Sequence, residues 1–128
     1  MREQRLKELP AELFDMAVML YQQGGEASLR SATTRSYYAV LSLARVVFDR
    51  PLDKGNHVHR EFPKWIKAAI SDEATASRLV DQAEKLYNSR IAADYNLAKP
   101  FAPERAAQSL QLAELLFNAL AAYGNERA

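Results

Sequence analysis

Residues 31–49, with the sequence SATTRSYYAVLSLARVVFD, constrain the fold more than any other part of the chain. Wound as an α-helix, this segment is apolar on nearly all of its surface. Such a helix belongs in the middle of a domain, because each apolar side needs another element to cover it. The exceptions are Arg35, Ser42 and Arg45, which fall on one narrow strip and need partners if that strip is covered. We therefore predict a central helix with a polar strip.

Apolar side chains recur with helical spacing in the other long segments, and no segment alternates in the two-residue period of a strand for long. In the first helix, for example, the apolar residues are Leu9, Leu13, Met16 and Leu20. The first predicted helix covers residues 8–23, and the second starts between residues 26 and 33 and reaches about residue 49. A short helix is predicted around residues 62–70, and two further long ones at 72–94 and 103–124. The predicted fold class is all-α: an up-and-down antiparallel bundle of four long helices plus one short helix.

Glycine, proline and a capping serine mark the predicted helix ends. Gly24-Gly25 and Gly124-Asn125 each follow an apolar stripe and are expected to end a helix. Ser71 is the expected cap of the fourth helix, and Pro63 is expected in the first turn of the short one. Residues 50–59 read as a loop, since Pro51, Asp53, Gly55 and Asn56 supply turn chemistry.

Composition bounds the class of protein. The 128 residues are one domain's worth, so residues 1–128 are expected to form a single domain. The net charge of +1 is not that of a strongly basic nucleic-acid-binding domain. The absence of cysteine excludes disulfides, thiolate metal sites and cysteine nucleophiles. With neither a membrane-spanning apolar run nor a secretory signal in view, we expect a cytoplasmic protein that makes no contact with membranes.

The standard motifs for phosphate loops, zinc, calcium and serine nucleophiles are missing, so no metal or cofactor is expected. Candidate functional residues are polar groups at positions where apolar ones would be easier. Arg90 continues an apolar stripe of the fourth helix, and Asp94 and Tyr95 follow it. Arg90 can either form a structural ion pair with Asp94 or point into a cleft and bind an anion. The sequence leaves both readings open.

Two further groups of residues also have a structural and a functional reading. His57 and His59, in the expected loop, are either surface residues or proton-transfer groups. Arg60, Lys64 and Lys67 with Trp65 form either a phosphate-and-stacking surface or a solvated face with the tryptophan turned into the core. The solvated face is the commoner outcome for such a run.

Several short motifs occur in an order and spacing that resemble the HEPN superfamily, the small helical domains named for nucleotide binding in higher eukaryotes and prokaryotes. The resemblance, to the short stand-alone prokaryotic members in particular, extends from about residue 32 to 95. It rests on Arg35-Ser36-Tyr37-Tyr38-Ala39, on Gly55-Asn56-His57 followed by Phe62, and on Leu86-Tyr87 followed by Arg90 and Ala93-Asp94-Tyr95.

The resemblance implies a helical bundle that forms a homodimer with a cleft between subunits. Many members are metal-independent ribonucleases, often toxins paired with a nucleotidyltransferase antitoxin, and others bind nucleotides. Their usual signature is an arginine followed four to six residues later by a histidine. Arg90 matches the arginine, but Asp94, Tyr95, Asn96 and Leu97 fill the window where the histidine is expected.

The missing histidine matters because metal-free RNA cleavage needs a base, an acid and a cation for the developing phosphorane charge. Arg90 supplies the cation, whereas a tyrosine such as Tyr95 is a poor base at neutral pH. The leading hypothesis is a dimer cleft that binds nucleotide or RNA phosphate, with Arg90 holding the phosphate and Asp94 orienting it. Arg35 assists, and His57 or Tyr95 transfers protons if there is turnover. The alternative is a non-catalytic module that partners a nucleotidyltransferase.

Overall fold

The computed structural model describes residues 2–50 and 58–127, all helices and their connections, with no strand in these two ranges. The helices are α1 (Arg2–Gln23), α2 (Glu26–Val47), α3 (Val58–Ala69), α4 (Glu73–Tyr95) and α5 (Pro103–Glu126). The predicted all-α class is therefore confirmed. None of the described helices is long and apolar enough to cross a membrane.

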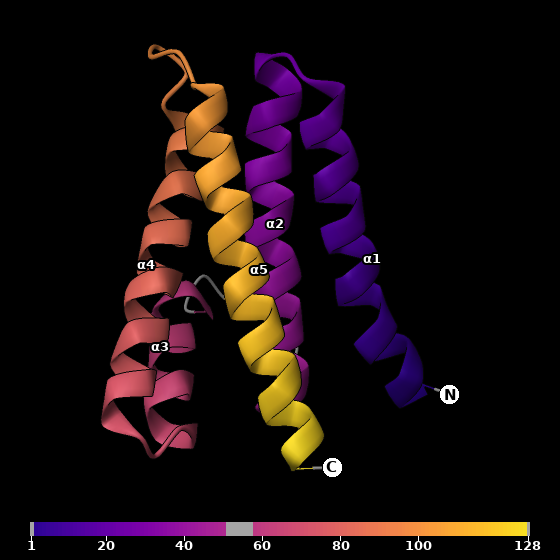
Figure 1. The fold of residues 1–128 in the computed structure, drawn as a ribbon, viewed down its shortest axis with the longest axis vertical. Helices are drawn as coiled ribbons and strands as arrows, with labels where there is room; N and C mark the ends of the chain where they lie inside the picture. The colour runs from indigo at the N-terminus through magenta and orange to yellow at the C-terminus, as the bar shows by residue number, and fades with distance from the viewer. Residues whose placement is uncertain (1, 51–57, 128) are drawn as a thin grey trace.

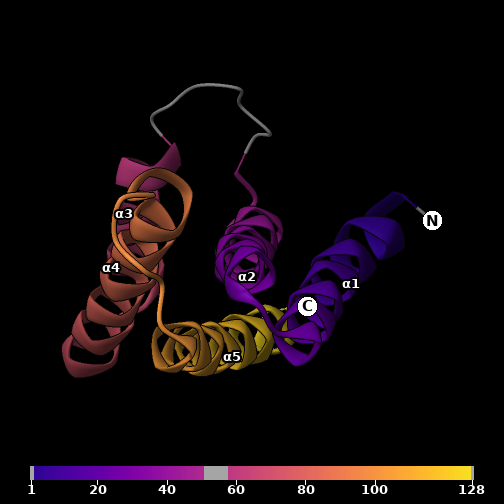
Figure 2. The same ribbon diagram turned by 90° about the horizontal axis from the view of Figure 1, so that it is seen from above.

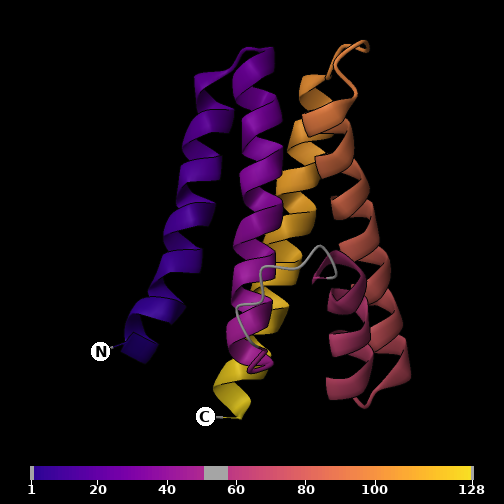
Figure 3. The same cartoon turned by 180° about the vertical axis from the view of Figure 1, so that it is seen from behind.

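The helices form a bundle in which α2 is the central element (Figure 1). It packs against α1 on one side and against α4 and α5 on the other, while α3 lies against α4. Seen from above, α1 stands at one edge and α4 at the other, with α2 between them (Figure 2). Helices α1 and α2 run in opposite directions, as do α4 and α5, and the neighbouring α2 and α5 run the same way (Figure 3).

The main core forms around α2, as its sequence predicts. Tyr37, Val40, Leu41 and Ala44 are buried, and they meet apolar residues of α3, α4 and α5. The residues contributed by those three helices are Val58, Phe62, Trp65, Ile66, Ala76, Leu79, Val80, Ala83, Leu86, Ala113, Leu116 and Leu120. Burial of these side chains is the dominant favourable contribution to folding.

The apolar stripe expected on α1 is only partly covered. Leu9 and Met16 are 40% and 47% exposed, and Met19 beside them is 68% exposed. Among the side chains described in this helix, from residue 8 onward, the fully buried ones are instead those of Pro10 and Ala17. Because α1 is an edge helix that packs mainly on α2, one side of its stripe has no neighbour within the described chain (Figure 2).

Three helix starts differ from expectation. Helix α1 begins at Arg2, so Pro10 lies inside it rather than near its start. Helix α3 begins at Val58, which places His59 in its first turn and Pro63 within the helix; the loop predicted for 50–59 was too long. Helix α4 is capped by Asp72, not Ser71, because the Asp72 carboxylate accepts from the Thr75 N–H at 3.1 Å. The Thr75 hydroxyl donates to the same carboxylate oxygen, and this bond together with the backbone one lowers the Asp72 pKa.

The two glycine signals have different outcomes. Gly24 and Gly25 separate α1 from α2 with φ angles of 75° and 86°, as predicted. Helix α5, however, continues through Gly124 to Glu126. A Cβ at Gly124 would lie 2.7 Å from Val47 Cγ1 of α2, so this glycine permits close approach of two helices rather than ending one.

Candidate functional site

Arg90 and Asp94, one turn apart near the end of α4, form the centre of the candidate site. The Arg90 Nε atom lies 2.8 Å from Asp94 Oδ2, and the Arg90 side chain is only 11% exposed. Thr34 of α2 donates a hydrogen bond to the other carboxylate oxygen, Asp94 Oδ1. The carboxylate therefore connects α2 to α4 and fixes one side of the Arg90 guanidinium.

Two tyrosines hold the guanidinium of Arg90. Its Cζ atom lies 5.2 Å from the ring centroid of Tyr38 on α2 and 5.6 Å from that of Tyr95 at the end of α4. Within residues 2–50 and 58–127, the terminal amino groups of Arg90 donate no hydrogen bond. Arg90 is thus a held cation whose outer N–H groups remain available to an acceptor.

His59, at the start of α3, lies beside this cluster. Its ring centroid is 5.2 Å from that of Tyr87, and its Nδ1 atom is 2.7 Å from the hydroxyl oxygen of Tyr37. Burial and the positive charges of Arg90 and Arg45 lower the pKa of His59 below 6.5, which favours the neutral imidazole. Burial raises the pKa of Tyr37, which keeps its proton.

The direction of the Tyr37–His59 hydrogen bond follows from the partners available. The buried Tyr37 hydroxyl has no other acceptor in the described part of the chain. We therefore assign the O–H as the donor and Nδ1 as the acceptor, because the opposite direction would leave a buried O–H unsatisfied. Neutral His59 then carries its own proton on Nε2, and it offers a hydrogen-bond donor rather than a base.

A groove of about 560 Å³ runs between α1, α2 and the end of α4. Arg35, expected in the site, is exposed and lines this groove together with Tyr38 and Asp94. The other lining residues are Leu13, Ala27, Arg30, Ser31, Thr34 and Ala93. Tyr38 and Asp94 are therefore shared between the groove and the Arg90 cluster.

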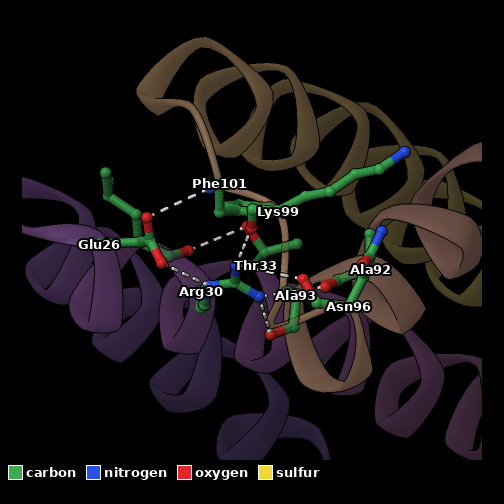
Figure 4. A network of polar contacts seen from close by, with 9 residues as sticks. Glu26, Arg30, Thr33, Ala92, Ala93, Asn96, Lys99 and Phe101 are labelled. Carbon is green, nitrogen blue, oxygen red and sulfur yellow. Dashed lines mark hydrogen bonds and ion pairs between the residues drawn. The ribbon is translucent and has the colours of Figure 1, made fainter.

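Arg30 is a site-forming residue that sequence reasoning missed (Figure 4). Its side chain is 10% exposed, and its guanidinium binds backbone carbonyls at the end of α4 and in the connection from α4 to α5. Nε donates to Glu26 at 3.2 Å, and the two terminal nitrogens donate to the backbone carbonyls of Ala92, Ala93, Asn96 and Lys99 at 3.2, 3.0, 3.3 and 2.6 Å. Arg30 thereby supplies donors to the Ala93 carbonyl at the α4 C-terminus and to two carbonyls of the connector, whereas the Ala92 carbonyl also accepts from the Asn96 N–H.

Five residues were predicted for the site, and the four of them that the structure describes lie near one another. Arg90, Asp94 and Tyr95 lie in one cluster, and Arg35 lines the groove that shares Asp94 with it. His57 lies outside the described residues. The histidine found near Arg90 is His59, which the sequence analysis named with His57 but left out of the leading hypothesis; preferring it requires the start of α3 at Val58.

The basic run on α3 follows its structural reading. Arg60, Lys64 and Lys67 are exposed, whereas Trp65 is only 7% exposed and packs against Phe62 in the core. No aromatic platform accompanies these cations. Across the described ranges, no group of three or more potential metal ligands comes together.

Comparison with known proteins gives no match: no family model, no curated protein and no solved structure is significantly similar to this chain. What the chain does must therefore be argued from the site itself.

Proposed function

We propose that the protein is a HEPN-type domain that binds the phosphate group of a nucleotide or of RNA at Arg90. In this proposal the four long helices alternate in direction along the chain, as in an up-and-down antiparallel bundle, with α3 beside α4. Two copies form a homodimer with the site in a cleft between them. The observation that carries the proposal is the state of Arg90: nearly buried, held by Tyr38, Tyr95 and Asp94, with its terminal N–H groups unused in the described structure.

Phosphate is the ligand that best fits this arrangement. A guanidinium presents two parallel N–H groups that match two oxygens of a phosphate, and charge-assisted hydrogen bonds of this kind are strong. Asp94 neutralises part of the charge but contacts Nε alone, so the outer edge of the guanidinium stays open. Arg35 is exposed, lines the groove that shares Tyr38 and Asp94 with this cluster, and offers a second cation.

Binding is supported more directly than cleavage. Strand cleavage needs a base for the 2′-hydroxyl, and the His59 tautomer assigned above offers a donor instead. A donor helps to bind a phosphate oxygen, which agrees with a binding site. Metal-independent ribonuclease activity remains a second stage of the proposal, in which His57, His59 or Tyr95 would move the protons.

The test is binding of a fluorescent, mixed-sequence single-stranded RNA in excess chelator, followed by anisotropy. We expect Arg90→Ala to weaken binding roughly tenfold or more, and Arg90→Lys to restore part of it, because lysine keeps the charge but loses the two-pronged geometry. Lys85→Ala is the matched control, since Lys85 is an exposed cation on the same helix. Equal affinities for wild type and Arg90→Ala would refute the proposed site.

Cleavage of the same RNA tests the second stage. If wild type cuts the strand in chelator, His57→Ala and His59→Ala, each checked for folding, identify which histidine is required. Loss of cleavage in His57→Ala alone would move the proton-transfer role to a residue outside the described ranges. Loss in His59→Ala alone would assign a proton-transfer role to His59, which the Nε2 proton allows it to fill as the acid.

A protein-binding role is the second candidate, and the open side of α1 favours it. Leu9, Met16 and Met19 are exposed there, and such apolar side chains on an edge helix are typical of a protein interface. A second copy or a nucleotidyltransferase are the partners to test. If the partner is a second copy, light scattering after size exclusion is expected to give a dimer, and Met16→Glu is expected to disrupt it. If the protein is a monomer that binds the nucleotidyltransferase of a neighbouring gene, the non-catalytic module is favoured.

A further inference from the structure

The groove between α1, α2 and α4 lies beside the Arg90 cluster and shares Tyr38 and Asp94 with it, although Arg90 itself does not line the groove. Asp94 contributes one carboxylate oxygen to the ion pair with Arg90 and the other to the hydrogen bond with Thr34 in the groove. The Tyr38 side chain lies against Arg90 and lines the groove as well. A ligand with its anion on Arg90 would therefore have the groove beside it, across Tyr38 and Asp94.

The volume and walls of the groove restrict the rest of that ligand. About 560 Å³ is in the range of sites for one small molecule and is too small for a nucleic-acid duplex. One part of the lining is apolar or aromatic, from Leu13, Ala27 and Tyr38, and another carries the hydroxyls of Ser31 and Thr34 and the carboxylate of Asp94. A planar group and a hydroxylated group would each find a suitable surface.

Arg30 lines the groove but does not compete for the anion. Each of its five N–H groups already donates to Glu26 or to a backbone carbonyl. Among the lining residues that the structure describes, Arg35 is the other cation, and it is exposed. The anionic end of a ligand is therefore directed to Arg90 and Arg35, and the groove itself receives an uncharged portion.

We propose that the groove holds the nucleoside of a single unpaired ribonucleotide, with the base against Tyr38 and Leu13 and the ribose 2′-hydroxyl donating to Asp94. This inference rests on the proposed phosphate site at Arg90. Each carboxylate oxygen of Asp94 has one engaged partner and retains a lone pair for a hydroxyl donor. Because the 2′-hydroxyl distinguishes RNA from DNA, the contact with Asp94 makes the site selective for the ribose form.

The test is calorimetric titration of wild type with inorganic phosphate, AMP and dAMP. We expect AMP to bind roughly tenfold or more tightly than phosphate, which corresponds to one base stacked on an aromatic ring. We expect dAMP to bind roughly tenfold less tightly than AMP, from the loss of one hydrogen bond to a charged group. These comparisons need no variant, so they do not depend on a mutant folding.

A groove-filling variant tests the location. Ala27 is exposed and lines the groove, so Ala27→Trp is expected to reduce AMP affinity to that of phosphate. Ala122→Trp, at an exposed position of α5, is the matched control and is expected to bind AMP like wild type. Circular dichroism checks that both variants fold.

The outcomes separate this inference from the proposed function. If phosphate and AMP bind equally, or if Ala27→Trp leaves AMP binding unchanged, the nucleoside site is wrong while phosphate binding at Arg90 stands. If neither phosphate nor AMP binds, single-stranded and duplex RNA are titrated next. Tighter binding of the single strand, abolished by Ala27→Trp, supports an unpaired nucleotide within RNA. No preference for the single strand overturns the inference, and no RNA binding at all overturns the proposed function too.

Discussion

Arg30 donates to the carbonyl of Ala93 at 3.0 Å, and Arg90 lies 2.8 Å from the carboxylate of Asp94, the very next residue. Both guanidinium groups therefore lie at the end of α4, that of Arg30 reaching it from α2 and that of Arg90 from α4 itself. They differ in what their N–H groups contact. All N–H groups of Arg30 go to protein acceptors, whereas the terminal groups of Arg90 have none in the described chain. This difference separates a structural arginine from a candidate ligand-binding one.

Replacing Arg30 is expected to destabilise the fold. Arg30→Ala removes these charge-assisted hydrogen bonds, so carbonyl groups of α4 and its connector lose a donor. We expect the free energy of unfolding to fall by roughly 2–4 kcal/mol. Arg30→Lys is expected to lose less, since it keeps the charge but supplies fewer donors. Urea denaturation measures both.

Arg105→Ala is the control for Arg30. Arg105 is exposed, and its guanidinium lies over the same Phe101 ring that Arg30 contacts. We expect a change of less than about 0.5 kcal/mol for this surface substitution. Equal effects of Arg30→Ala and Arg105→Ala would show that the ring contact, and not the hydrogen bonds to carbonyls, stabilises the connector.

The tautomer of His59 is open to direct measurement. With Tyr37 donating to Nδ1, we expect the nitrogen NMR spectrum at pH 7.5 to show His59 with its proton on Nε2. Tyr37→Phe removes this donor, so the spectrum is expected to move toward a mixture of tautomers. A proton on Nδ1 in the wild type would reverse the hydrogen bond and make His59 Nε2 available as a base.

The lowered pKa of His59 makes stability depend on pH. The unfolded chain takes up a proton on this histidine as the pH falls through 6.5, but the folded protein resists protonation until lower pH. The unfolded state therefore binds more protons in this window, and the free energy of unfolding is expected to fall as pH drops from 7.5 to 5. The cause is burial, together with Arg90 of α4 and Arg45 of α2.

His59→Asn isolates this contribution, because asparagine can accept from Tyr37 without titrating. We expect the variant to lose less stability than wild type between pH 7.5 and 5 in urea denaturation. His57→Asn is the matched control, since the chain has two histidines. If His57→Asn, and not His59→Asn, flattened the pH dependence, the effect would belong to His57 and the assignment to His59 would be wrong.

Helical periodicity was enough to predict the helices, the central position of α2 and the place of Arg90 on the packed side of α4. Each of these depends on the spacing of residues along a single helix, which the sequence states directly. Arg90 stands out because a cation interrupts an apolar stripe. Arg30 gave no such signal, since its main partners are backbone carbonyls more than sixty positions away, and any residue type has a carbonyl.

The roles of His59 and Gly124 depend on tertiary contacts in the same way. Composition made residues 50–59 look like one loop, and only the start of α3 at Val58 brings His59 to Tyr37 and Arg90. Gly124 has the sequence context of a helix end, yet the approach of Val47 from α2 explains it. Local patterns cannot distinguish a glycine that ends a helix from one that lets two helices touch.

The close approach at Gly124 predicts an unusual response to alanine. In an open helix, glycine to alanine stabilises by about 0.8–1 kcal/mol. Here the added Cβ would lie 2.7 Å from Val47 Cγ1, so Gly124→Ala is expected to destabilise by roughly 1–3 kcal/mol through overpacking. Val47→Ala removes the clashing methyl, and the double variant Val47→Ala/Gly124→Ala is expected to be more stable than the sum of the single effects predicts. Thermal and urea unfolding of the four proteins measure this coupling, and a stabilising Gly124→Ala would show that α5 can shift away from α2 at little cost.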